Sequence, residues 1–202
     1  MPQANLLMDV KQIERRIRLL QRQLQKNDRV RSNLDTYVQL ADLYQQLGAF
    51  EDQIEWLTKA YAILKRRQKP SAIRFKVLMS FTAAYKIFGS EKAKSLGLQY
   101  ADLALNEAKA LENHRLEQKA RHQQAFFFIS VFHSSENTDD LKKAEFLLNE
   151  MLTDGQRHEN KPDFRYIAYI HLGIINRYRD NIQEAKKGYH TTLYERVKNF
   201  GI

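Results

Sequence analysis

The sequence predicts an all-α fold built from paired helices, and two observations carry this prediction. Only 7 Gly and 3 Pro occur in 202 residues, and long stretches rich in Leu, Ala, Gln, Glu, Lys and Arg lie between them. Those residues lose little side-chain freedom in a helix, whereas Gly and Pro interrupt one. Apolar residues also recur every three or four positions, and no strand-like alternation competes with that pattern.

Turn residues divide the chain into nine predicted helices. Pro70 and Pro162 stand where a helix would begin, a position in which the missing N–H costs least, and Asp or Asn marks other starts. The predicted helices span residues 4–27, 31–47, 50–67, 71–88, 91–112, 115–133, 139–157, 162–179 and 182–199.

The composition limits the kind of protein. Because there is no cysteine, disulfides, Cys-ligated zinc and thiol catalysis are excluded. The opening residues lack the apolar core of a signal peptide, and no apolar run reaches about 18 residues, so we expect a cytoplasmic protein without a membrane span. The net charge of +9 favours acidic partners, nucleic acid among them, unless it merely reflects solvated helix faces.

Residues 1–30 differ from the rest and form a predicted unit of their own, a basic amphipathic helix. Apolar residues follow a heptad pattern, and Arg and Lys occupy the other faces. Such a helix could cap the array, lie in its groove or form a coiled-coil dimer, and we favour the cap because three heptads make a short coil. The heptad positions are Leu6, Val10, Ile13, Ile17, Leu20 and Leu24.

Residues 31–202 contain four similar helix pairs. In the first, Leu40, Ala41 and Tyr44 precede Gly48 and Phe50 at the turn, and Leu57, Ala60 and Leu64 follow. In the last, Leu172, Gly173 and Asn176 are followed by Ala185, Tyr189 and Leu193. Small residues at fixed positions let two antiparallel helices approach closely, while bulky ones fill the groove to the next pair.

These residues resemble the tetratricopeptide (TPR) superfamily, which implies a right-handed α-solenoid of about four helix pairs. The anchors Leu40, Phe81, Phe128 and Leu172 are 41, 47 and 44 residues apart, longer than the family's usual ~34. The two central pairs are expected to share a longer turn. The lengthened repeats are similar to those of bacterial peptide-pheromone receptors and signalling regulators.

The resemblance also implies which residues line the concave groove formed by the first helix of each pair. Apolar anchors would dock on Met79, Phe126 and Ile170, while Lys86, His133 and Arg177 would orient acidic groups. The alternative is that the superhelix itself buries these apolar anchors, so that they bind no partner. The full set is Val38, Asp42, Gln45, Met79, Lys86, Phe126, Ser130, His133, Ile170, Ile174 and Arg177.

No motif indicates catalysis, a metal or a cofactor. The six histidines show no metal-ligand spacing, and phosphate-binding loops and nucleophile elbows are absent from the sequence. Val38 and Asp42 also depart from the carboxylate clamp with which some family members grip chaperone tails.

The sequence therefore predicts a non-enzymatic adaptor or regulatory module that binds a protein or peptide with acidic and apolar features. One alternative is a peptide-sensing regulator that acts on a separate effector. Another is a nucleic-acid-associated factor that uses basic patches such as 65–67. A homodimer through the N-terminal helix or the C-terminal end is a further expectation.

Overall fold

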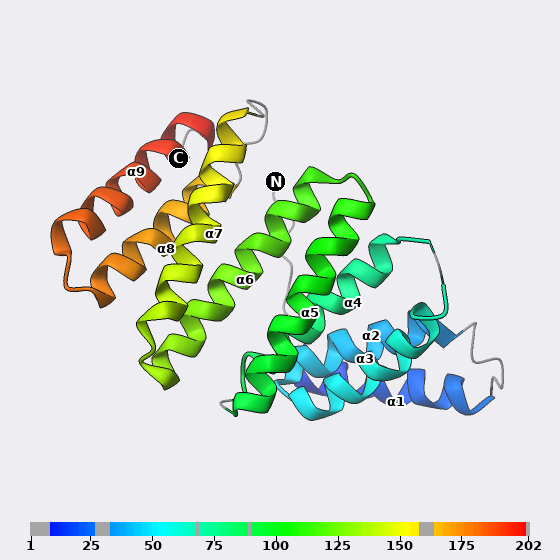
Figure 1. Cartoon of the computed structure of the whole chain (residues 1–202). Helices are drawn as coiled ribbons and strands as arrows, with labels where there is room; N and C mark the ends of the chain where they lie inside the picture. Colours follow the sequence, from blue (N-terminus) through cyan, green and yellow to red (C-terminus); the bar gives the residue numbers. More distant parts are fainter. Residues whose placement is uncertain (1–8, 27–32, 68, 89, 158–163, 201–202) are drawn as a thin grey trace.

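A computed structural model of the chain describes residues 9–26, 33–67, 69–88, 90–157 and 164–200 (Figure 1). Every regular element in these ranges is an α-helix, so the all-α prediction is confirmed. The helices are α1 (Val10–Lys26), α2 (Leu34–Leu47), α3 (Phe50–Leu64), α4 (Ala72–Tyr85), α5 (Glu91–Ala110), α6 (His114–Ser135), α7 (Thr138–Arg157), α8 (Arg165–Tyr178) and α9 (Ile182–Phe200).

Helices α2 to α9 form four consecutive pairs, α2/α3, α4/α5, α6/α7 and α8/α9. Each pair makes its most extensive contacts internally, and the second helix of each of the first three pairs also packs on the next pair. In Figure 1 the pairs stack along one direction, with α1 at one end and α9 at the other. The chain therefore has the predicted solenoid architecture.

Helix starts in the middle of the chain follow from their capping residues. Ser71, Ser90 and Asn113 each accept a hydrogen bond from the backbone N–H three residues on, at 3.2–3.3 Å. This bond satisfies one of the N–H groups that the first turn of a helix leaves unpaired. Gly48 ends α2 with φ of 72°, a left-handed conformation that Gly adopts without steric cost.

Aromatic side chains dominate the core between the first and second pairs. The Phe81 ring stacks on Tyr100 with centroids 4.2 Å apart, and Tyr61 meets Phe81 edge-on at 6.1 Å. Leu57 and Val77 are fully buried around them. Large rings here bridge neighbouring pairs, the role that the repeat pattern assigns to bulky residues.

Three adjacent phenylalanines on α6 separate as the helical rotation of about 100° per residue requires. Phe127 is fully buried and lies so close to Gly97 of α5 that an added Cβ would overlap the ring. Phe128 packs on the core between the third and fourth pairs. Phe126, on the remaining side, is only half-buried.

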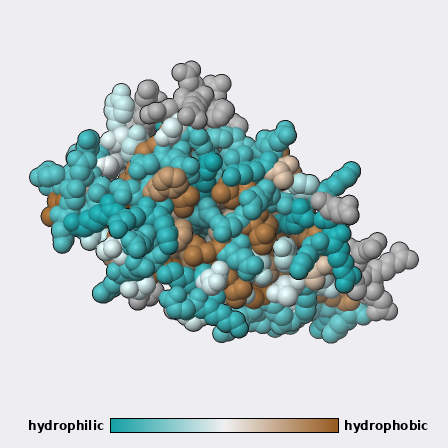
Figure 2. Space-filling view, viewed as in Figure 1, coloured by the Kyte–Doolittle hydropathy of each residue, from teal (hydrophilic) through white to brown (hydrophobic). Residues whose placement is uncertain are grey.

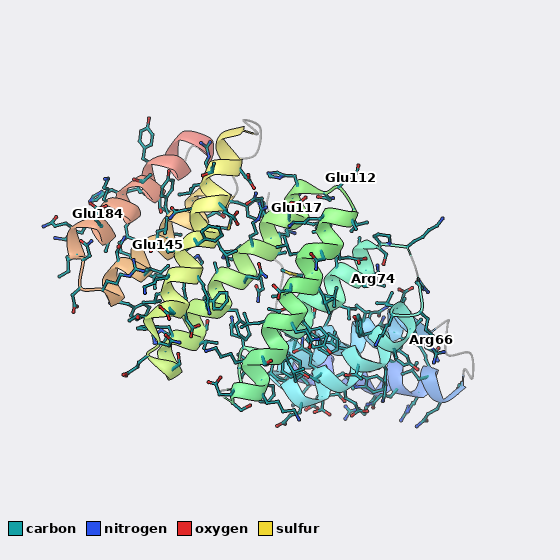
Figure 3. All side chains as sticks on the ribbon, in the orientation of Figure 1. Arg66, Arg74, Glu112, Glu117, Glu145 and Glu184 are labelled. Carbon is teal, nitrogen blue, oxygen red and sulfur yellow. The ribbon has the colours of Figure 1, made fainter. Side chains whose placement is uncertain are left out.

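Ion pairs connect equivalent helices of neighbouring pairs. Lys76 of α4 contacts Asp42 of α2 with 2.5 Å between Nζ and Oδ2. Lys94 of α5 contacts Asp140 of α7 at 3.0 Å, and this carboxylate is almost completely buried. Figure 3 shows charged side chains, among them Arg74 and Glu145, distributed along the array.

Helix α1 packs on α2 through part of its heptad pattern. Ile13, Ile17 and Leu20 are buried against Leu40 and Leu43. Val10, by contrast, is exposed, and Leu6 lies outside the described residues. This packing covers the outer side of the first pair, and the choice between cap and dimer stays a prediction.

Two details differ from the sequence expectations. The third pair has no longer turn, since α6 continues to Ser135 and α7 starts at Thr138, so the extra spacing is helical. Helix α3 ends at Leu64 rather than 67 because the basic residues that follow carry no apolar face to pack. Within the described part of the chain, every helix is too short or too polar to cross a bilayer.

Candidate functional site

The candidate site lies on the first helices of the pairs, α2, α4, α6 and α8. Helix α4 contacts α6, and α6 contacts α8, so side chains from successive pairs meet. On α4 the predicted residues Met79 and Lys86 recur at helical spacing, as Phe126, Ser130 and His133 do on α6. We call the surface that these residues occupy the first-helix face.

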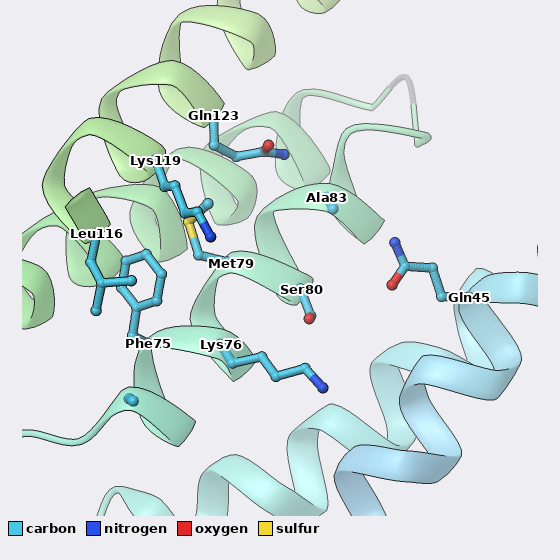
Figure 4. A pocket seen from close by; sticks show the side chains of 10 residues that line it. Gln45, Phe75, Lys76, Met79, Ser80, Ala83, Leu116, Lys119 and Gln123 are labelled. Atoms are coloured by element: carbon cyan, nitrogen blue, oxygen red, sulfur yellow. The ribbon is translucent and has the colours of Figure 1, made fainter. Parts of the chain in front are cut away.

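A cleft opens on this face between α2, α4 and α6 (Figure 4). Its volume is about 420 Å³, and we call it the α4 cleft. Phe75, Met79 and Leu116 provide apolar walls, and Ala83 leaves room beside them. The polar rim comes from several helices and consists of Gln45, Lys76, Ser80, Lys119 and Gln123. An apolar floor with a few convergent polar groups is typical of ligand-binding clefts.

Asp42 is the one predicted groove residue that carries a negative charge. Its carboxylate accepts a hydrogen bond from Lys76 Nζ, across the junction between the first and second pairs. This pairing offsets the negative charge at the edge of the α4 cleft. The unpaired charge on the rim is therefore the exposed ammonium of Lys119, for which the described residues provide no ion-pair partner.

A second group of side chains lies one helical turn further along. Lys86 Nζ is 3.8 Å from the centroid of the Phe126 ring. The rings of His122 and His171 lie 6.2 and 5.3 Å from the same ring, and 5.0 Å from each other. We call Lys86, His122, Phe126 and His171 the Lys86 cluster.

Burial makes the charged forms of this cluster costly. Desolvation lowers the pKa of His122 to about 4, and the nearby His171 and Lys86 contribute to the same shift. The pKa of His171 also falls through burial, and that of Lys86 falls for the same reason. Both imidazoles are consequently neutral near pH 7.

The α4 cleft and the Lys86 cluster adjoin each other. Ala83 lines the cleft and Lys86 follows three positions later on α4, while Gln123 and Phe126 have the same relation on α6. Residues three apart lie on one helix face. The first-helix face therefore joins an apolar cleft to a group rich in nitrogen atoms.

The remaining predicted residues are more dispersed. Ser130 donates its hydroxyl to the Phe126 carbonyl oxygen at 2.8 Å, and His133 contacts the Tyr178 hydroxyl across the α6–α8 junction. Arg177 is exposed, Ile170 is half-buried, and Ile174 packs partly on the core. These residues border the Lys86 cluster without joining it.

Val38 is predicted to line the groove, but the structure buries it in the core. Only 6% of it is exposed, and it belongs to the same core cluster as Val77 and Phe81. The reason is that side chains of α3 and α4, among them Leu57 and Val77, enclose it in a shared core. Helix α2 therefore contributes Asp42 and Gln45, but not Val38, to the first-helix face.

Sequence reasoning missed His122 and His171. They are 49 positions apart and occupy different places in their repeats, six before Phe128 and one before Leu172. No spacing rule connects two such positions, because the contact depends on how α8 crosses α6. The one signal in the sequence was Phe126, because three adjacent phenylalanines on a helix cannot all face the same core.

The other candidate chemistry is weaker. The described residues contain no group of three acidic or histidine side chains placed to hold a metal ion. Next to the basic segment after α3, Arg74 of α4 pairs with the buried Glu107 at 2.7 Å and donates to the Arg67 carbonyl oxygen. Part of the positive charge there thus stabilises the fold.

The fold defines a class of protein, the α-helical repeat proteins. No family model and no curated protein matches the chain. Among solved structures it is similar to a Podosopora anserina protein described as a kinesin light chain with nearly identical TPR-like repeats. The TM-score is 0.76 at 15% identity, covering 95% of this chain and 90% of that one.

A second similar structure is MamA, with a TM-score of 0.62 at 19% identity, covering 94% of this chain and 92% of the other. Among α-helical repeat proteins, the chain thus has the TPR-like fold, which confirms the resemblance drawn from its repeats. At these identities the likeness concerns the fold alone. The narrower similarity to peptide-pheromone receptors stays a prediction.

Proposed function

We propose that the chain is a non-enzymatic scaffold that binds an extended peptide, or a segment of a protein, along the first-helix face. The observation that carries the proposal is the α4 cleft, an apolar opening of about 420 Å³ that adjoins the Lys86 cluster. TPR-like neighbours support a protein-interaction role, because stacked helix pairs offer a long pre-formed surface.

The chemistry of the face suggests the partner. Phe75, Met79 and Leu116 would receive apolar side chains, because burying an apolar side chain stabilises a complex by about 1.5–3 kcal/mol. Lys119 on the rim would favour acidic groups. The bound segment therefore has apolar residues separated by acidic ones. By binding such a segment, the chain would act as an adaptor or as a peptide sensor.

The space-filling view shows how apolar groups are distributed on one side of the molecule. In Figure 2 hydrophobic atoms form separate patches in a surface that is mostly hydrophilic on this side of the molecule. Local apolar patches with polar borders are typical of interaction sites rather than of surfaces that aggregate.

The test uses an array of random dodecapeptides covering acidic, neutral and basic compositions. We expect the protein to select peptides with acidic and apolar residues, and Ala83→Arg to reduce their binding at least about tenfold by filling the α4 cleft. Ala110→Arg, the same change at an exposed position on α5, should bind as the wild type does.

Two results would contradict the proposal. One is equal peptide binding by the wild type and Ala83→Arg. The other is no peptide selection at all together with duplex DNA or RNA binding that persists at physiological salt, which would favour the basic patches instead.

A further inference from the structure

Three nitrogen-bearing side chains surround the Phe126 ring, and they come from three helices. Lys86 stands at the C-terminal end of α4, His122 and Phe126 belong to α6, and His171 belongs to α8. All four side chains are half-buried, so they are neither part of the closed core nor fully solvated. The position is continuous with the α4 cleft.

The charged groups around the cluster are mostly positive. Within the described residues, His171 and Lys86 are the ionisable groups that influence His122, and Lys119 lies one turn away on the same side of α6. Two acidic groups on the flanking helices are engaged elsewhere. Asp154 of α7 pairs with Arg121, and Asp102 of α5 accepts from Gln124 at 2.6 Å.

The two histidines differ in their hydrogen bonding. His171 Nδ1 lies 3.0 Å from the Ile167 carbonyl oxygen, which requires a proton on Nδ1 and leaves Nε2 as an acceptor in the neutral ring. His122 Nε2 is buried and has no hydrogen-bond partner in the described part of the chain. Buried polar atoms are almost always paired, so an unsatisfied nitrogen next to Gln123, which lines the α4 cleft, points to a bound group.

We infer that the Lys86 cluster is a subsite for a carboxylate, in which Lys86, His122 and His171 contact the ligand. This inference rests on the proposed function and specifies the chemistry of one part of the first-helix face. Phe126 provides an apolar base that holds the three groups together. The carboxylate comes from the bound peptide, either from an Asp or Glu side chain or from its C-terminus.

Binding requires a local rearrangement. Because His122 Nε2 is covered in the free protein, the Lys86 chain or the imidazole ring rotates as the carboxylate arrives. Lysine has a flexible four-carbon stem, so its ammonium can leave the Phe126 face and pair with the carboxylate. Both imidazoles then gain an anionic neighbour, which favours their protonated, donating form.

The subsite is therefore pH-dependent, and the sign follows from linkage. Burial keeps the pKa of His122 near 4 and lowers that of His171, so the free cluster binds few protons at pH 7. A carboxylate raises both values, so binding takes up protons from the solvent and strengthens as the pH falls. Below about pH 4.5 the ligand itself becomes protonated and affinity declines again.

The experiment follows the ring nitrogens of ¹⁵N-labelled histidines by NMR in the full-length protein. The probes are N-acetyl-leucine, which mimics a C-terminal carboxylate, N-acetyl-leucyl-glutamate amide, which offers a side-chain carboxylate, and uncharged N-acetyl-leucinamide. We expect at least one carboxylate probe to raise the pKa of both histidines and to bind about tenfold more tightly near pH 5.5 than near pH 7.5. N-acetyl-leucinamide should do neither, and the stronger carboxylate probe identifies the source.

Variants separate ligand contact from structure. Lys86→Met keeps the aliphatic chain on Phe126 but removes the ammonium charge. His122→Phe and His171→Phe keep the ring contacts but remove the nitrogens that would take up a proton and donate to the carboxylate. We expect each to lose about tenfold in carboxylate binding near pH 5.5, whereas His190→Phe, at an exposed site on α9, retains it. Circular dichroism shows which variants fold. If a variant does not fold, the NMR titration of the wild-type protein still tests the inference.

The inference is overturned if no carboxylate probe shifts His122 or His171, or if the uncharged probe binds as well as the charged ones. Failure here is distinguishable from failure of the proposed function. Array peptides that still bind, and bind equally with carboxylates changed to amides, would reject the subsite and keep the scaffold. An Ala83→Arg protein that binds array peptides normally would reject the α4 cleft instead.

Discussion

The second pair, α4/α5, and the fourth pair, α8/α9, each contain a glycine that packs against an aromatic ring, but the two rings are buried to different extents. Gly97 of α5 contacts Phe127 of α6, in the next pair, and Gly173 of α8 contacts Tyr189 of α9, in the same pair. Phe127 is fully buried, whereas 36% of Tyr189 is exposed. The α4/α5 pair has neighbours on both sides, while within the described chain α8/α9 has a neighbour on one side.

From this difference in burial we expect that the position of a pair in the array, rather than the repeat pattern itself, determines how much each contact stabilises the fold. Ala101 and Ala104 on α5 are fully buried, but Ile182 and Leu193 on α9 are each 60% exposed. In a repeat array each unit gains stability from its neighbours, so a unit at one end gains less. Matched substitutions in the two pairs can measure this directly.

The largest contrast is expected between Phe81→Ala and Leu193→Ala. Phe81 is 1% exposed and stacks on Tyr100, so removing its ring should lower the free energy of unfolding by about 3–5 kcal/mol. Leu193 is mainly solvated, and its truncation should cost about 0.5 kcal/mol or less. Urea denaturation followed by circular dichroism measures both, and equal losses would disprove the dependence on position.

Removal of one charge from an ion pair should give an intermediate contrast. Glu107 is buried, pairs with Arg74 at 2.7 Å and accepts from the Ser71 N–H at 2.6 Å. Glu107→Gln leaves that arginine without its counter-charge, which should cost about 2–3 kcal/mol.

The control is Glu145→Gln on α7, which breaks a pair with Arg179 at 2.8 Å whose members are both about one-third exposed. Exposed pairs contribute little, so the loss should be about 0.5 kcal/mol or less. Denaturation at low and high salt checks the assignment, because the exposed pair should weaken further with salt. A similar cost for both variants would show that burial does not distinguish them.

The smallest contrast concerns the two glycines. An added Cβ at Gly97 would overlap Phe127 Cε2 inside a closed core, so Gly97→Ala should destabilise by about 1–3 kcal/mol. At Gly173 the nearest atom is Tyr189 Cε1 at 2.9 Å, on a ring that can move toward solvent. The helix preference of Ala over Gly, about 0.5–1 kcal/mol, then offsets the crowding.

Thermal unfolding of the two glycine variants measures this contrast. We expect a lower Tm for Gly97→Ala and little change for Gly173→Ala. A drop for Gly173→Ala as large as that for Gly97→Ala would mean that the last pair is packed as rigidly as the centre.

Much of the fold could be predicted because packing requirements are local. Small residues such as Ala60 and Ala185, at fixed distances from bulky ones, indicate helix pairs, and capping residues indicate several starts. The spacing from Phe132 to Ala144 predicts a longer turn, yet it reflects a longer helix. Spacing alone does not separate these two cases, since both add residues between the same packing positions.

The site was harder to predict than the fold. Spacing within one helix puts Met79 and Lys86 on a common face, and the structure keeps them there. It does not show how closely neighbouring helices approach, so Val38 is predicted at the surface but is buried. For the same reason the meeting of His122 and His171 could not be predicted.

The ion pairs between equivalent helices also bear on the response to salt. Lys76–Asp42 joins the first pair to the second, and Lys94–Asp140 joins the second pair to the third. The first is largely solvated and the second is buried, so salt screens the first far more than the second. We therefore expect rising ionic strength to weaken the contact between the first and second pairs slightly more than the contact between the second and third pairs.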